Sequence, residues 1–109
     1  MANSFKNYLK PGVGMTANAV YSPITLGMQS TIIGMTLANV TDLPVYASVK
    51  LSSGAANSYL IKDALIPTGG TLVPIGGDQK LVMAQSDILY VNSSANTSVD
   101  VIVSVLEIS

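Results

Sequence analysis

The sequence of 109 residues contains no cysteine, no histidine, no arginine and no tryptophan. Without cysteine and histidine, the usual ligand sets for zinc, copper and iron are missing. The same absences exclude histidine-based acid–base catalysis, cysteine nucleophiles and a Ser–His–Asp triad. Because no disulfide can form, the protein must be held together by its core or by its neighbours.

Charge is scarce as well. Charged residues make up 10% of the chain, against about 25% in a typical soluble domain. Hydrophobic residues make up 49% and the mean hydropathy is +0.49, a balance that argues against disorder. A surface with so few charges suits burial against partners, since the cores of interfaces are depleted in charge. The alternative is an ordinary monomer with a polar but uncharged surface.

Neither a nucleic-acid partner nor a membrane partner is expected. The scattered lysines form no basic run, and there is no arginine for phosphate or guanine contacts. The five lysines are Lys6, Lys10, Lys50, Lys62 and Lys80. The longest apolar segment, residues 31–40, is far too short to cross a bilayer. The first six residues lack the apolar stretch of a signal peptide, so we expect synthesis in the cytoplasm.

Turn signals recur at short spacing along the whole chain, among them Pro11-Gly12, Ser52-Ser53-Gly54 and Gly76-Gly77-Asp78. Short alternating segments lie between them, a rhythm typical of a β-sandwich or barrel. We therefore predict an all-β fold, a single antiparallel β-sandwich of jelly-roll or immunoglobulin type with about nine short strands. Residues 11–109 form the sandwich, and residues 1–10 form an N-terminal arm or the first edge strand of the same domain.

Period-two alternation predicts which residues face the core. It is clearest in the last strand, where four valines share one face, and Gly34 within another strand suggests a bulge or a close backbone approach. The predicted core residues are Ile33, Met35, Leu37, Val45, Val49, Val99, Val101, Val103 and Val105. Because chain ends are free to extend to a neighbour, the predicted interface residues are Ser4, Phe5, Tyr8 and Leu9.

The acidic residues are not clustered in the sequence. They are Asp42, Asp63, Asp78, Asp87, Asp100 and Glu107. A carboxylate pair of a glycosidase and a calcium site built from turn aspartates are alternatives, but the sequence contains no motif for either. We predict no catalytic, cofactor-binding or metal-binding residue, and no cofactor.

The tyrosines are the remaining candidates for recognition. They are Tyr8, Tyr21, Tyr46, Tyr59 and Tyr90. Tyrosine brings a large apolar area and a polar tip to carbohydrate and protein interfaces. Their spread along the chain argues against one dense binding cluster and favours ordinary, half-buried strand positions.

The order of these segments carries a resemblance over nearly the whole chain. The segments are Met1 to Leu9, Val20 to Pro23, Ile32 to Thr41, Val45 to Leu51, Tyr59 to Ala64, Ile66 to Leu72, Gly76 to Met83, Ser86 to Ser93 and Ser98 to Glu107. Together they resemble small virion structural proteins of tailed bacteriophages of the cyanophage and marine-phage type. Relatives usually carry Gly-Asp before the penultimate strand, where this chain has Ser86-Asp87; we expect a type I turn there, which tolerates serine.

The resemblance implies a non-enzymatic particle component. The foremost expectation is a capsid decoration (cement) protein that stabilises the assembled head, with the major capsid protein and further copies of itself as partners. A homo-oligomer located in the virion follows from this. The alternatives are a neck, tail or baseplate component, or a carbohydrate-binding sandwich at the virion surface.

Overall fold

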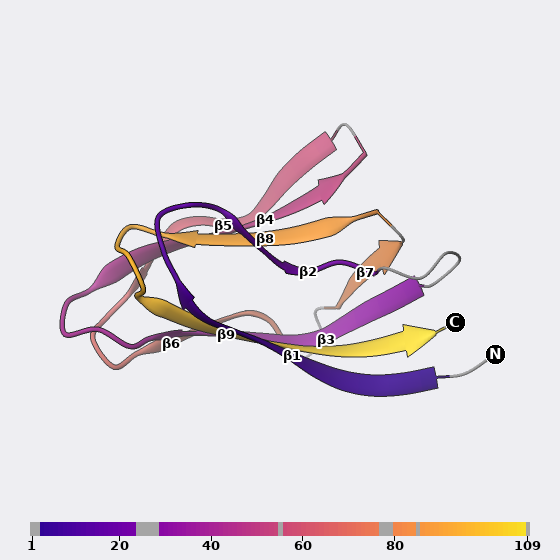
Figure 1. The fold of residues 1–109 in the computed structure, drawn as a ribbon, viewed down its shortest axis with the longest axis horizontal. Coiled ribbons are helices and arrows are strands. Elements are labelled where there is room, and N and C mark those ends of the chain that lie inside the picture. Colours follow the sequence, from indigo (N-terminus) through magenta and orange to yellow (C-terminus); the bar gives the residue numbers. More distant parts are fainter. Residues whose placement is uncertain (1–2, 24–28, 55, 77–79, 85, 109) are drawn as a thin grey trace.

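The computed structural model describes residues 3–23, 29–54, 56–76, 80–84 and 86–108. Within these ranges the chain forms nine β-strands and no helix (Figure 1). The strands are β1 (Asn3–Val13), β2 (Asn18–Tyr21), β3 (Gln29–Asn39), β4 (Val45–Ser53), β5 (Ala56–Ile66), β6 (Thr71–Ile75), β7 (Leu81–Ala84), β8 (Ile88–Ser93) and β9 (Val99–Ile108).

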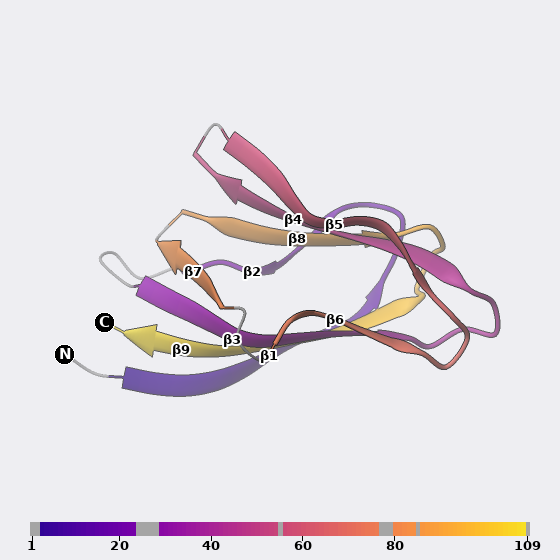
Figure 2. The same cartoon turned by 180° about the vertical axis from the view of Figure 1, so that it is seen from behind.

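The strands form two antiparallel sheets that lie over one another (Figures 1 and 2). Sheet A has the order β1-β9-β3-β6, and sheet B has the order β2-β8-β4-β5. Strand β7 pairs with residues 29–32 of β3 and β6 with residues 35–38, so β6 and β7 lie end to end along one edge of β3. The predicted all-β sandwich is confirmed.

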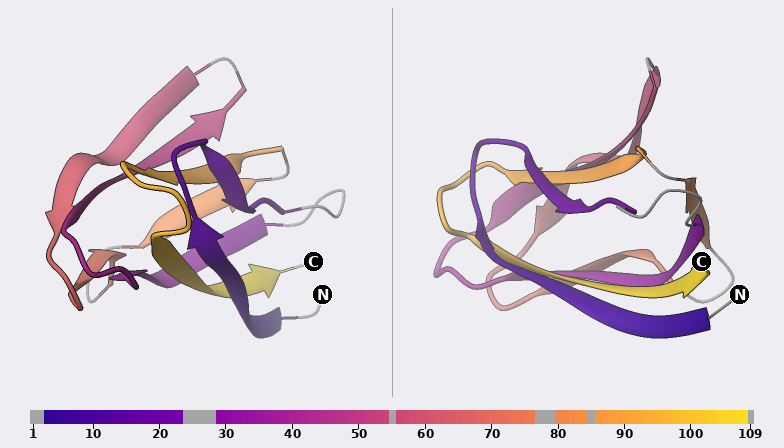
Figure 3. Two further views of the ribbon diagram at one scale, coloured as in Figure 1. Left: turned by 60° about the vertical axis from the view of Figure 1, so that its left-hand side comes forward. Right: turned by 45° about the vertical axis from the view of Figure 1, so that its right-hand side comes forward.

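The pairing between strands is nested. The first strand pairs with the last, β2 pairs with β8, β3 pairs with β6, and β4 pairs with β5. The chain is thus arranged like one long hairpin whose two arms are rolled into two layers. At one end, the β4–β5 hairpin rises away from sheet A (Figure 3).

The first residues are an edge strand and not a free arm. From Asn3 to Lys10, every residue of β1 has a partner on β9, and the register shifts only before Val13. No strand among the described residues covers the other edge of β1. Of the two predicted alternatives for the N-terminal residues, the structure has the first edge strand.

The core lies between the sheets, and the predicted alternation places most of it. The predicted residues that are fully buried are Met35, Leu37, Val45, Val49, Val99, Val101, Val103 and Val105. Ile33 is a correction: it is only partly buried, and Ile32 is in the core instead. The reason is a bulge at Ile33. Ile32 is opposite Val105 and Gly34 is opposite the adjacent residue Ser104, so two steps along β3 correspond to one step along β9. The extra residue reverses the alternation.

The turn before β8 differs from the expected type. The N–H of Asp87 donates to the carbonyl of Ala84 at 3.1 Å, so a four-residue turn is present. Ser86, at its third position, has φ of 79°. A type I turn has a negative φ there, whereas the positive value favours glycine. Ser86 therefore occupies a backbone conformation that favours glycine.

Candidate functional site

The outer face of sheet A carries apolar side chains in rows that run across the strands. In one row, the register places Phe5 opposite Leu106, Leu106 opposite Thr31, and Thr31 opposite Val82. Residues paired in this way lie on the same side of a sheet. The row therefore crosses β1, β9, β3 and β7.

A second apolar row lies four residues further along, where Leu9 is opposite Ile102 and Ile102 is opposite Thr36. Between the two rows is a row of smaller residues, Asn7 and Ser104 with Gly34. The Ser104 hydroxyl donates to Asn7 Oδ1 at 2.7 Å. We call these three rows the uncharged face.

The uncharged face is open to solvent. The exposed fractions are 72% for Phe5, 69% for Leu9, 69% for Val82 and 44% for Ile102. Along β1, β9 and β3, the one charged residue at an outward register position is Asp100, whose carboxylate accepts the Gly12 N–H at 2.9 Å. Rows of exposed apolar side chains with so little charge are typical of an interaction surface.

The four predicted interface residues divide between the two sides of β1. Phe5 and Leu9 point outward and belong to the uncharged face. Ser4 is exposed but shares the alternation of the inward side. Tyr8 is half-buried on the inward side, and its hydroxyl donates to Glu107, so it does not belong to the uncharged face.

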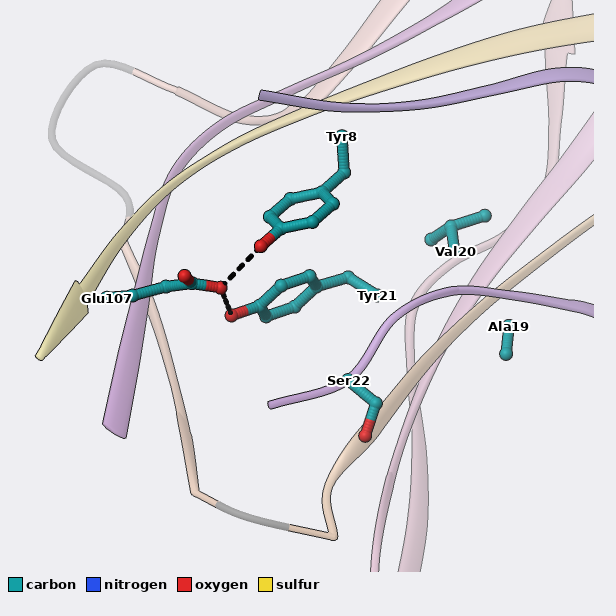
Figure 4. Close-up of a pocket in the computed structure, with 6 residues that line it drawn as sticks. All are labelled: Tyr8, Ala19, Val20, Tyr21, Ser22 and Glu107. Carbon is teal, nitrogen blue, oxygen red and sulfur yellow. Dashed lines mark hydrogen bonds between the residues drawn. The ribbon is translucent and has the colours of Figure 1, made fainter. Parts of the chain in front are cut away.

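Behind β1, Glu107 is a buried carboxylate with three partners, two of which, Tyr8 and Tyr21, are drawn in Figure 4. Its side chain is only 7% exposed. Its Oε2 accepts hydrogen bonds from Tyr8 at 2.8 Å and from Tyr21 at 2.7 Å, and Lys6 Nζ lies 3.4 Å from its Oε1. Since the single proton of the Tyr21 hydroxyl is given to Glu107, the Ser30 hydroxyl must donate in its 2.5 Å contact with Tyr21.

These contacts join both sheets, because Tyr8 lies on β1, Glu107 on β9 and Tyr21 on β2. The two rings also touch, with centroids 5.0 Å apart. Beside them is a pocket of about 340 Å³. It is lined by Tyr8, Ala19, Val20, Tyr21, Ser22 and Glu107.

Near neutral pH, Tyr8 and Tyr21 keep their protons and Glu107 is ionised. Burial and the neighbouring Glu107 raise the pKa of Tyr8 to about 12, and the same causes raise the pKa of Tyr21 further still. Burial acts to raise the pKa of Glu107, but hydrogen bonds from Tyr21, Tyr8 and Lys6 outweigh it and leave that pKa below its ordinary value. General acid–base catalysis works best with a pKa near the working pH, and these shifts move the pKa values of all three groups away from neutrality.

The outer face of sheet B is of a different kind, because it carries tyrosines and lysines. The register places Tyr59 and Tyr90 on either side of Lys50. Lys50 Nζ lies 5.2 Å from the Tyr90 ring centroid, and Lys62 Nζ lies 5.0 Å from that of Tyr59. Tyr46 is half-exposed on the same strand as Lys50. The spread of these tyrosines in the sequence suggested no cluster, but sheet pairing brings two of them together.

Three aspartates accept hydrogen bonds from neighbouring strands and turns. Asp63 contacts the Ser48 hydroxyl, Asp87 accepts from Ser53 and from the Ala84 N–H, and Asp100 accepts from Gly12. Residues 77–79, which include Asp78, lie outside the described residues. In the described part of the chain, no group of three acidic side chains is placed to hold a metal ion, and no helix is long and apolar enough to cross a membrane.

Three comparisons with known proteins find no significant match. The chain matches no family model, no curated protein and no solved structure. The resemblance to phage virion proteins therefore stays a prediction.

Proposed function

We propose that the protein is a non-enzymatic structural component of a bacteriophage virion, foremost a capsid decoration protein that stabilises the assembled head. The observation that carries the proposal is the uncharged face, which is broad, apolar and open to solvent in the single chain. Burial of this face against other particle proteins would remove apolar area from water, the main driving force of association.

We further propose that the sandwich is a jelly roll. The nested pairing, with β1 on β9, β2 on β8, β3 on β6 and β4 on β5, supports this. In immunoglobulin-type sandwiches, by contrast, the sheets have the order ABED and CFG, so the first strand does not pair with the last. Jelly rolls are common among viral capsid and lectin domains, although a fold alone does not establish a function.

The buried Glu107 cluster supports a packing role because it makes the face rigid. Tyr8 and Lys6 bind Glu107 from the inward side of β1, while Phe5 and Leu9 project from the outward side of the same strand. An interface that is ordered before binding loses less conformational entropy when it forms. Many copies on a symmetric shell then each need only a modest contact.

A charge on the uncharged face is expected to release the protein from its particle. Leu9→Asp would bury an unpaired carboxylate in the contact, and we expect retention on particles to fall at least about tenfold. The matched control is Leu65→Asp, since Leu65 is another exposed leucine (54%) on an edge strand, but of sheet B. Particles that lack the protein are mixed with each variant and sedimented, and bound protein and survival on heating are measured.

Equal retention of both variants, or absence of the protein from purified particles, would contradict the proposal. Copy number then separates the two locations in the particle. Many copies per virion would place the protein on the capsid, while a few would favour the neck, tail or baseplate.

A second candidate function is favoured by the row of Tyr59, Lys50 and Tyr90. A sheet face with at least partly exposed rings and ammonium groups suits carbohydrate, because rings bring apolar area and the lysines donate hydrogen bonds. We expect Tyr59→Ala to abolish glycan-array binding if this face recognises sugars, while Leu9→Asp leaves that binding unchanged. An array on which the wild-type protein binds no glycan would eliminate this candidate.

A further inference from the structure

We propose that the pocket beside Tyr8 and Tyr21 binds an organic cation, namely a primary ammonium group on a short apolar stem, as at the end of a lysine side chain. Tyr8 lines the pocket from the inward side of β1, whereas Phe5 and Leu9 of the uncharged face project from the outward side. Cation binding is therefore independent of the proposed packing function, and either can hold without the other.

The pocket has the size of a site for a small organic group. Its volume is about 340 Å³, at the lower end of the roughly 300–1,000 Å³ of small-molecule sites. It lies between edge strands of the two sheets, because Tyr8 belongs to β1 while Ala19, Val20 and Tyr21 belong to β2. The lining is mostly apolar, so a hydrocarbon stem is favoured there over a fully polar ligand.

The polar side chains of the lining already donate their hydroxyl protons within the protein. Tyr8 and Tyr21 both donate to Glu107. The Ser22 hydroxyl donates to the carbonyl of Asp87 at 2.7 Å. These side chains are left with acceptor capacity, on the carboxylate and on the Tyr8 oxygen. The pocket therefore favours a ligand that brings its own proton donors, and it disfavours an anion, which needs donors from the protein.

Glu107 supplies a buried negative charge at the pocket. Its side chain is only 7% exposed, and its lowered pKa keeps it ionised near neutral pH. Lys6 Nζ lies 3.4 Å from Oε1, which is longer than the about 2.7–2.9 Å of a charge-assisted hydrogen bond. Because each carboxylate oxygen can accept two hydrogen bonds, Oε1 can accept a second and shorter one from a bound ammonium group.

The two rings favour an organic cation over a metal ion. The centroids of Tyr8 and Tyr21 are 5.0 Å apart and the ring planes are tilted by 49°. A cation is attracted to the face of such a ring within about 6 Å of its centroid. Calcium would instead need about six to eight oxygen ligands, and among the described residues that line the pocket Glu107 is the only carboxylate.

The first test is a titration of the protein with butylammonium at constant chloride, followed by two-dimensional NMR of the backbone amides. We expect shifts in β1 and β2 beside the pocket and a dissociation constant on the order of 1 mM, because so small a ligand buries little surface. Butanol has a similar shape without the charge and should bind at least about tenfold more weakly. Equal binding of butanol, or no binding of butylammonium well above that concentration, would overturn the proposal.

A second ligand separates the two sources of this chemistry. N-acetyl-lysine methylamide carries the ammonium group on a side chain attached to a backbone, as in a partner protein. If it binds as tightly as butylammonium, the pocket accepts a lysine of a partner; if only butylammonium binds, the occupant is a free amine. Both results support the cation site.

A variant that fills the pocket locates the binding. Val20 lines the pocket, and its side chain points from β2 toward β1 (Figure 4). Val20→Trp should therefore abolish butylammonium binding. The matched control is Val73→Trp, because Val73 is an exposed valine (59%) on β6; it should bind as wild type does. Circular dichroism confirms that both variants fold. Unchanged binding by Val20→Trp would show that the amine binds elsewhere.

Two changes of charge have opposite expected effects, which a general loss of structure would not produce. Lys6→Gln removes the competing ammonium group near Oε1, so butylammonium should bind about threefold more tightly. Glu107→Gln keeps the shape of the side chain without its charge and should bind at least about tenfold more weakly. Weaker binding by Lys6→Gln, or unchanged binding by Glu107→Gln, would contradict a cation site at this carboxylate.

Discussion

Ile32→Ala is expected to lower the free energy of unfolding by about 3 kcal/mol, whereas Ile33→Ala should cost less than about half as much. Ile32 is fully buried against the core, while Ile33 lies at the bulge and is partly exposed. Truncation of Ile32 removes buried methyl groups and leaves a cavity, because the surrounding side chains relax only partly. The two residues are neighbours of the same type, so each is the other's control.

Urea unfolding followed by far-ultraviolet circular dichroism measures both losses. The measurements belong at low protein concentration, where association does not add to the stability of the folded state. The reverse order, with the larger loss at Ile33, would mean that the alternation of β3 continues without a bulge as the sequence pattern suggests. Equal losses would be inconsistent with the burial of the two side chains.

The difference between the two isoleucines shows where sequence patterns succeed. Strand β9 was predictable because its alternation is uninterrupted, and all four valines from Val99 to Val105 are buried. In β3, apolar residues occupy both faces, so the period of two has little contrast. Gly34 indicated a bulge, but the direction in which the bulge shifts the register depends on the pairing with β9.

The candidate sites were less predictable because they depend on long-range pairing. Continued alternation in β9 places Glu107 on the same face as the valines, and this signal could have identified a buried carboxylate. Its partners could not be found in this way, since Tyr21 and Tyr8 are 86 and 99 residues away in the sequence. The cross-strand neighbours that form the uncharged face and the tyrosine row depend on strand order in the same way.

Glu107→Ala is expected to lower the free energy of unfolding by about 3 kcal/mol, a loss comparable with that of a core truncation. The substitution removes the acceptor of the Tyr8 and Tyr21 hydroxyls and the partner of Lys6. A buried donor without an acceptor costs free energy because water cannot replace the lost hydrogen bond. Small domains are stable by only about 5–15 kcal/mol, so the loss is easily measured by urea unfolding.

Glu107→Gln is the matched variant, because glutamine has the same shape and keeps one acceptor oxygen without the charge. We expect a smaller loss than with alanine. If alanine and glutamine cost the same, the charge is the main contribution. If neither substitution lowers the stability, the contacts of Glu107 contribute nothing and the rigidity attributed to β1 has another source.

The pH dependence of stability distinguishes the contribution of the Glu107 carboxylate. Hydrogen bonds from Tyr21, Tyr8 and Lys6 overcome the effect of burial and hold the pKa of Glu107 below its ordinary value of 4.5. A lowered pKa means that the stabilising contribution is complete above pH 4.5 and is lost as the pH falls through the folded-state value. The advantage of wild type over Glu107→Gln should therefore be constant near neutrality and shrink below pH 4.5.

At alkaline pH the ionisation of the tyrosines makes the unfolding free energy fall as the pH rises. The pKa of Tyr8 is raised from 10.0 to about 12, chiefly by burial and by the neighbouring carboxylate. Its contribution is therefore complete below pH 10 and is lost as the pH rises toward 12. Tyr8→Phe removes this ionisation, so its unfolding free energy should fall less steeply above pH 10 than that of wild type. Parallel alkaline profiles of the two proteins would show that Tyr8 ionises as it does in the unfolded chain, without the contact to Glu107.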